Sequence, residues 1–142
     1  MEELKAIATH TRMTLEAMLT QSLGHHETTG ACLYASFLCH ALISKFTSAS
    51  AIIRGGDGLQ DGGVFVGDRG YGHYWVEATH EDATYVIDIS ADQFGLEQVI
   101  VAPIGALPAR YIPGNQRVID GHVRDLKKDI ENDQAEQNTT AE

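Results

Sequence analysis

Two residues in the middle of the chain, His73 and Asp88, are of types that exchange protons in acid–base catalysis. The segments that carry them, residues 71–78 and 84–89, have the alternating pattern of β-strands and are expected to form a hairpin. If the loop comprises the four residues 79–82, the register places His73 directly opposite Asp88 on one face, with Cβ atoms about 4.5 to 5.5 Å apart. A carboxylate at that separation holds one imidazole nitrogen and leaves the other free to act as a base.

A thiol that such a base could activate lies upstream, at Cys32. It falls in the first turn of an apolar segment, residues 31–46, which predicts a buried central helix. The positive end of the helix dipole favours thiolate over thiol, and a nearby imidazolium favours it further, which gives a nucleophile for acyl transfer. First-turn amides could stabilise the oxyanion. The upstream candidates for a side-chain oxyanion donor are Gln21, His25 and His26. This chemistry requires no cofactor.

The residues around these positions form three short motifs: Gly30-Ala31-Cys32, His73-Tyr74-Trp75-Val76-Glu77 and Tyr85-Val86-Ile87-Asp88-Ile89-Ser90. In this order, over about residues 28–95, they resemble the core of the transglutaminase-like superfamily, relatives of the papain-like cysteine enzymes. The resemblance implies that Cys32 is the nucleophile, His73 the general base and acid, and Asp88 the carboxylate that orients the imidazole. It implies a thiol-dependent hydrolase or acyltransferase acting on amide bonds of a protein or peptide: a peptidase, amidase, deamidase or small transglutaminase-like enzyme.

The remaining segments predict the elements that must position these residues. Residues 2–23 and 117–132 have apolar side chains at helical spacing and predict an N-terminal and a C-terminal helix. Short β-branched runs at 50–53, 64–66 and 99–104 predict further strands, separated by glycine-rich and proline-rich connections. Helices first and strands afterwards indicate an α+β fold, with the central helix packed on an antiparallel sheet as in the transglutaminase-like core.

Composition places the chain among globular proteins, with 43% hydrophobic and 21% charged residues. At 142 residues it fits one domain, residues 1–132, followed by a flexible acidic tail at 133–142. The net charge of -10 argues against sequence-independent binding to nucleic acid and against an anionic membrane surface. No apolar run approaches the roughly 18 residues that a membrane span needs.

The cellular compartment is inferred from the N-terminus and the cysteines. The first residues are acidic where a secretory signal would be basic, so export is not expected. Cys32 and Cys39 would lie about 10 Å apart along one helix, too far for a disulfide. Two free thiols are typical of a reducing compartment, and we expect a cytoplasmic protein.

Several of these residues have plainer interpretations. Cys32 taken alone is typical of a buried structural cysteine, and core packing is the better interpretation of Cys39. Asp92 is a rival carboxylate, but its surroundings indicate a turn. Tyr71 and Trp75 are candidates for lining the substrate cleft; Trp75 equally fits the core beneath the site, and Tyr71 an ordinary turn.

Metal binding is disfavoured by residue spacing. Residues 57–68 match an EF-hand calcium loop at a few positions, but Leu59 stands where a ligand is needed. No paired zinc-ligand motif of the usual short spacing occurs among Cys32, His25, His26 and His73.

The glycine-rich stretch at 55–72 is either a lip over the cleft or a plain flexible loop. The alternative function is a catalytically inactive fold that binds a protein partner.

Overall fold

The structure, a computed structural model, describes the backbone of residues 1–23 and 31–140 and the side chains of residues 1–21 and 31–132. Its helices are α1 (Glu2–Leu23), α2 (Cys32–Phe46) and α3 (Gln116–Thr140), with short 3₁₀ helices η1 (Ala91–Phe94) and η2 (Ile104–Ala106). The predicted α+β architecture with an antiparallel sheet is confirmed. None of the helices in these ranges is long and apolar enough to cross a membrane.

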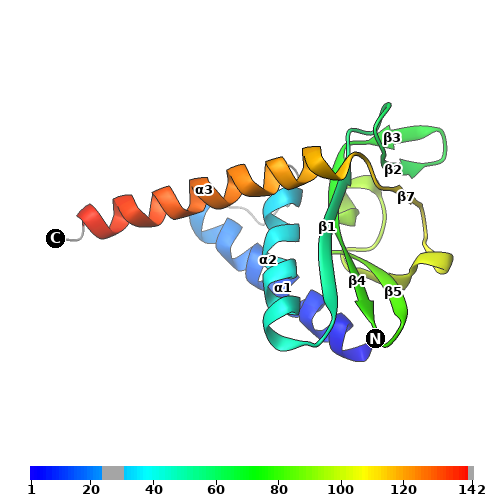
Figure 1. Ribbon diagram of the computed structural model, residues 1–142, viewed down its shortest axis with the longest axis horizontal. Coiled ribbons are helices and arrows are strands. Elements are labelled where there is room, and N and C mark those ends of the chain that lie inside the picture. Colours follow the sequence, from blue (N-terminus) through cyan, green and yellow to red (C-terminus); the bar gives the residue numbers. More distant parts are fainter. Residues whose placement is uncertain (24–30, 141–142) are drawn as a thin grey trace.

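The strands form two antiparallel sheets. The larger has the order β1-β4-β5-β6, with strands β1 (Ser50–Gly56), β4 (His73–His80), β5 (Ala83–Asp88) and β6 (Ile100–Pro103). The smaller has the order β3-β2-β7, with strands β3 (Arg69–Tyr71), β2 (Gly63–Val66) and β7 (Arg110–Ile112). In Figure 1 the small sheet lies at one end of the larger one, and α3 runs across the molecule and projects beyond the other elements.

The two faces of the larger sheet are buried by different partners. One face packs on α1 and α2 through a cluster that includes Leu15, Ile43, Val76 and Ile87. The other face meets the small sheet through the cluster Val64, Trp75, Val86 and Tyr111. Because side chains alternate along a strand, His73 and Asp88 lie on the small-sheet side, together with Trp75 and Val86. The His73–Asp88 pair therefore lies on the face of the sheet that turns away from α1 and α2.

Helix α2 is the central helix that its apolar sequence predicts. Its buried stripe comprises Ala35, Ser36, Cys39 and Ile43, and α1, α3, β1 and β4 all contact it. Helix α1 is continuous from Glu2 to Leu23, the range that its apolar spacing predicts. The central position fixes where the first turn of α2, and hence Cys32, meets the sheet.

The hairpin that joins β4 to β5 has a shorter loop than the sequence predicted. His80 pairs with Ala83, so the loop is Glu81 and Asp82, both with positive φ, at 52° and 66°. The predicted four-residue loop was therefore wrong. Ala78 consequently pairs with Tyr85, and the register moves by two residues. A shift of two preserves the face of every side chain, so His73 and Asp88 stay on one face but are diagonal neighbours and not a direct pair.

Other boundaries also differ from the prediction. The single strand expected over 71–78 is divided at Gly72, so that Tyr71 ends β3 in the small sheet and His73 begins β4 in the large one. Strand β7 lies in a segment whose prolines suggested no regular structure. Helix α3 continues to Thr140, past Asn132, because residues such as Gln, Ala and Glu favour helix even where few are apolar.

The glycine-rich connection between β1 and β2 is a compact turn organised by one carboxylate. Asp57 Oδ1 accepts hydrogen bonds from the amides of Leu59, Gln60 and Asp61, at 2.8, 3.1 and 3.0 Å. Gly58 has a φ of 78°, which favours glycine. The Asp57 carboxylate is thus engaged by its own loop, as in an ordinary Asx turn.

Candidate active site

The structure brings His73 and Asp88 together in a buried hydrogen bond. His73 Nε2 lies 2.8 Å from Asp88 Oδ2, and the two residues are 1% and 2% exposed. The Tyr111 hydroxyl donates to the same carboxylate oxygen at 2.8 Å, and the Ser90 amide donates to Oδ1 at 3.0 Å. The carboxylate is therefore fully satisfied in a buried setting, which is the arrangement that keeps a buried charge in place.

The environment of His73 favours its protonated form. Burial by itself lowers the pKa of the imidazole, but the negative charge of Asp88 and the hydrogen bond to it outweigh burial. The neighbouring Cys32 side chain raises the pKa further, to about 9. At neutral pH the imidazole is thus held as an imidazolium between the Asp88 carboxylate and the Cys32 side chain.

Cys32 reaches His73 although α2 packs on the opposite face of the sheet. Cys32 is the first residue of α2 and His73 the first residue of β4, so both lie at element ends, where a helix terminus can reach around the sheet. Because Nε2 is bound to Asp88, Nδ1 is the nitrogen left for the half-buried thiol. Ala31, which precedes the helix, has no side-chain group to cap the first-turn amides.

Gln93 is part of the site, although no motif in the sequence singles it out. Its Nε2 lies 3.3 Å from His73 Nδ1 and 3.0 Å from the Ser90 carbonyl oxygen. Because that oxygen can only accept, the atom facing both groups is the amide nitrogen. Gln93 can therefore donate to Nδ1 only when the imidazole is neutral, because both nitrogens of an imidazolium are donors. The only signal in the sequence was its place in the turn directly after the Asp88 strand.

A buried arginine from α1 fixes that turn. Arg12 is 4% exposed, and its Nη1 donates to the Ile89 carbonyl oxygen at 2.8 Å. It also makes a bidentate pair with Asp92, at 2.8 and 2.9 Å, and bonds Glu16 at 2.8 Å. Asp92, the rival carboxylate, thus pairs with Arg12 and lies in the short 3₁₀ helix η1 after β5. These contacts of Arg12 connect α1 to the segment that carries Asp88 and Gln93.

Aromatic rings enclose the imidazole. Phe94 meets His73 edge-on with centroids 4.7 Å apart, and Tyr71 packs on Phe94 at 4.5 Å. Trp75 is 1% exposed and contacts Tyr111 at 5.2 Å, so it supports the site from beneath and has little surface to offer a substrate. Tyr71, which is half-buried, is the better placed of the two predicted cleft residues.

The other predicted residues lie apart from this pair. Gln21 is exposed near the end of α1, and among the described residues no hydrogen bond joins it to Cys32 or His73. His25 and His26 lie outside the described residues. Cys39 is buried in the core, and burial raises the pKa of its thiol to about 12, which suits a packing role. Within the described ranges, no group of three metal-ligating side chains could hold an ion.

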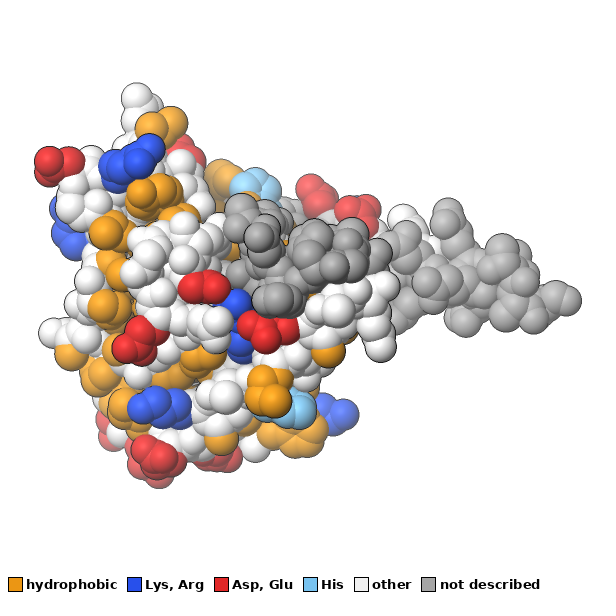
Figure 2. Space-filling view, turned by 180° about the vertical axis from the view of Figure 1, so that it is seen from behind, with side chains coloured by type: hydrophobic (Ala, Val, Ile, Leu, Met, Phe, Trp, Pro, Cys, Tyr) orange, Lys and Arg blue, Asp and Glu red, His pale blue; other side chains and the backbone are white. Residues whose placement is uncertain are grey.

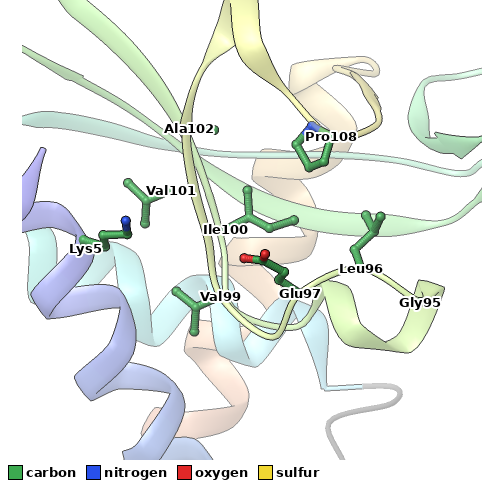
Figure 3. Close-up of a pocket in the computed structure, with 9 residues that line it drawn as sticks. All are labelled: Lys5, Gly95, Leu96, Glu97, Val99, Ile100, Val101, Ala102 and Pro108. Atoms are coloured by element: carbon green, nitrogen blue, oxygen red, sulfur yellow. The ribbon is translucent and has the colours of Figure 1, made fainter.

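A cavity of about 430 Å³ lies away from this site, along the outer strand β6. Its walls come mainly from residues 95–102, with Lys5 reaching in from α1 and Pro108 from the segment before β7 (Figure 3). Lys5 and Glu97 are its charged groups, and its lining includes neither a thiol nor an imidazole. Nothing in this lining could serve as a nucleophile with its base, in contrast to the Cys32–His73–Asp88 cluster.

Surface charge on the visible face is mixed. Among the residues coloured by type in Figure 2, acidic, basic and apolar side chains are interspersed, and the basic ones do not gather into one field. A phosphate backbone would need such a field.

A scan against protein-family models, a search of curated proteins and a search of solved structures each found no match to this chain. The structure itself defines the fold class, which is α+β with a four-stranded antiparallel sheet and a small second sheet. Its function must therefore be argued from the geometry of the site.

Proposed function

We propose that this protein is a cysteine enzyme of the transglutaminase-like type, which transfers the acyl group of an amide through Cys32, His73 and Asp88. The observation that carries the proposal is the buried hydrogen bond between His73 Nε2 and Asp88, in an imidazole whose pKa the neighbouring Cys32 side chain also raises. One carboxylate, one imidazole and one thiol in series are the parts that nucleophilic acyl transfer requires.

The reaction would proceed in two balanced steps. The Cys32 thiolate attacks the amide carbonyl carbon to form a C–S bond, the C–N bond breaks, and the leaving nitrogen takes the proton from the His73 imidazolium. Water or an amine then attacks the thioester and gives its proton to His73. The carboxylic acid or new amide leaves, and the thiolate is regenerated beside the imidazolium. First-turn amides of α2 are the donors available to the oxyanion.

The test of the nucleophile uses the second cysteine as an internal control. Iodoacetamide near neutral pH should alkylate Cys32 much faster than Cys39, and His73→Ala should remove that advantage. Peptide mass mapping of both thiols measures the ratio. If both thiols react equally slowly in the native protein, the enzyme proposal is wrong, and the protein-binding alternative is favoured.

The acyl substrate requires a second experiment. An amide-containing peptide library is incubated with the protein, and the release of free amine or ammonia is measured with Cys32→Ser as the blank. Acyl-enzyme adducts on native Cys32, identified by intact mass, would show which amide is attacked. Adding a primary amine then distinguishes hydrolysis from amine transfer, because a new amide product forms only in transfer.

A further inference from the structure

Two adjoining cavities form a groove between the Cys32–His73 pair and α3. The first, of about 290 Å³, has His73 in its wall, and the second, of about 330 Å³, has Leu33, the residue after Cys32. Tyr74 and His122 line both cavities, so the two adjoin at this pair. The Tyr74 hydroxyl lies 2.6 Å from His122 Nδ1, which ties β4 to α3 at their junction. We call this the α3 groove.

The wall that α3 contributes is one face of the helix. Val118, His122, Asp125 and Asp129 line the groove at spacings of four, three and four residues, which is the spacing of a helical face. None of the residues that line the groove is a lysine or an arginine. The basic residues in the described part of α3 occupy its other positions: Arg117, Arg124, Lys127 and Lys128. The described part of α3 thus contributes carboxylates, and no lysine or arginine, to the lining of the groove.

The groove combines an apolar floor with an acidic rim. Its carboxylates are Asp57 and Asp61 in the first cavity and Asp125 and Asp129 in the second. Hydrogen bonds from the amides of its own loop lower the pKa of Asp57, which keeps that carboxylate charged. The apolar lining residues are Leu33, Val118, Ile119 and Leu126. Lysine and arginine side chains match this combination, because a long apolar stem carries a charged end.

We propose that the α3 groove binds an extended peptide segment bearing lysine or arginine side chains and presents its backbone to Cys32. The proposal rests on the proposed function for the chemistry, and it adds the substrate class. The stems of the basic side chains lie on the apolar floor while their charged ends meet the acidic rim. Together the cavities are of the size that accommodates a few residues of peptide.

Charged thiol reagents test the groove without requiring turnover. Cys32 is modified with a trimethylammonium-ethyl and with a sulfonato-ethyl methanethiosulfonate, and the ratio of the two rates is measured by mass mapping. We expect the cationic preference to fall roughly fivefold in Asp125→Asn/Asp129→Asn, and to shrink in 0.5 M salt. The matched control is Asp120→Asn/Glu131→Gln, which removes two charges from other positions of the same helix. Equal ratios in the two double variants would overturn the proposal.

Peptide probes separate failure of the groove from failure of the enzyme. Chloromethyl ketones of one peptide, with lysine, norleucine or glutamate beside the reactive group, are tested for labelling of Cys32. The proposal expects the order lysine, norleucine, glutamate, and loss of that order in Asp125→Asn/Asp129→Asn. Equal labelling by all three leaves the nucleophile intact and refutes the groove. No labelling by any peptide, with the cationic preference toward small reagents intact, refutes the presentation of a peptide to Cys32 and leaves only an acidic surface beside the thiol.

Discussion

Asp88 holds the imidazole and also carries the charge that keeps it protonated. Its carboxylate accepts from His73, Tyr111 and the Ser90 amide at once, so the ring cannot rotate without breaking a buried hydrogen bond. This makes Asp88 the residue that both orients His73 and raises its pKa. A variant of Asp88 that loses the charge but keeps the shape should separate two effects of the carboxylate: its orientation of the His73 ring and its effect on the pKa of that ring.

Asp88→Asn is expected to lower turnover of an amide substrate by roughly 10² to 10⁴-fold, because the asparagine no longer stabilises the imidazolium. Alkylation of Cys32 at pH 7 should slow in parallel. The measurements are kcat and the iodoacetamide rate. Glu97→Gln is the control, since Glu97 is an exposed carboxylate of the following segment. If both variants lose activity equally, Asp88 has no special role in the chemistry.

Gln93 donates to an imidazole nitrogen that can accept only while His73 is neutral. Its hydrogen bond therefore opposes protonation, and Gln93→Leu should raise the pKa of His73 above about 9. One neutral hydrogen bond is about 1 kcal/mol, which corresponds to an increase of about half a unit to one unit. NMR titration of the imidazole carbons measures it. Gln98→Leu, at an exposed glutamine of the following segment, should leave the titration unchanged.

The residue types of the site could be read from the sequence, but their supporting contacts could not. Cysteine, histidine and aspartate at the ends of predicted elements suggested the chemistry directly. Arg12 and Asp92 are separated by 80 positions, and Tyr111 meets Asp88 across the two sheets. No periodicity reports such contacts, because they depend on how whole elements pack.

At the scale of the elements, the sequence predicted which face of the sheet each side chain occupies, but it did not predict how the residues of β4 and β5 pair. The alternation of side chains placed His73 and Asp88 on one face whether the loop has two residues or four. The loop itself is Glu-Asp, which lacks the Asn-Gly or Asp-Gly signature of a two-residue turn. Strands β3 and β7, at three residues each, are too short for any alternating pattern to identify.

The β4–β5 turn stores strain that substitution should relieve. Glu81 and Asp82 both have positive φ, where asparagine and glycine are favoured. Glu81→Asn/Asp82→Gly should raise the free energy of unfolding by roughly 1 kcal/mol, measured by urea denaturation. Activity should not change, because the turn lies at the far end of β4 from His73. Asp82→Ala should stabilise nothing, since alanine is strained at this φ; equal gains from both variants would contradict this account.

For the whole molecule, the site lies at one end of the large sheet, where segments distant in the sequence meet. This position explains why its residues come from different elements. The first turn of α2, the start of β4 and the end of β5 supply Cys32, His73 and Asp88, and the small sheet closes over them through Tyr111. Helix α1 holds the turn after β5 through Arg12. Folding of the domain and assembly of the site are thus one event, so the state of the buried ion pair should be visible in the stability of the entire protein.

That coupling predicts how stability depends on pH. Folding raises the pKa of His73 from 6.5 to about 9, so the folded protein keeps a proton that the unfolded chain releases between these values. The stabilising contribution is complete below about pH 6.5 and is lost as the pH rises through about 9. The free energy of unfolding should therefore fall across this range by up to roughly 3 kcal/mol.

Urea denaturation from pH 6 to 9.5 measures this dependence against His73→Gln. The variant lacks the titrating group, so its free energy of unfolding should be flatter over the same interval, whatever its absolute stability. Asp88→Asn should also flatten the curve, because it removes the charge that raises the pKa of His73. Curves that run parallel for the native protein and both variants would mean that His73 is not protonated by folding. The thiolate–imidazolium pair on which the proposed reaction depends would then be absent.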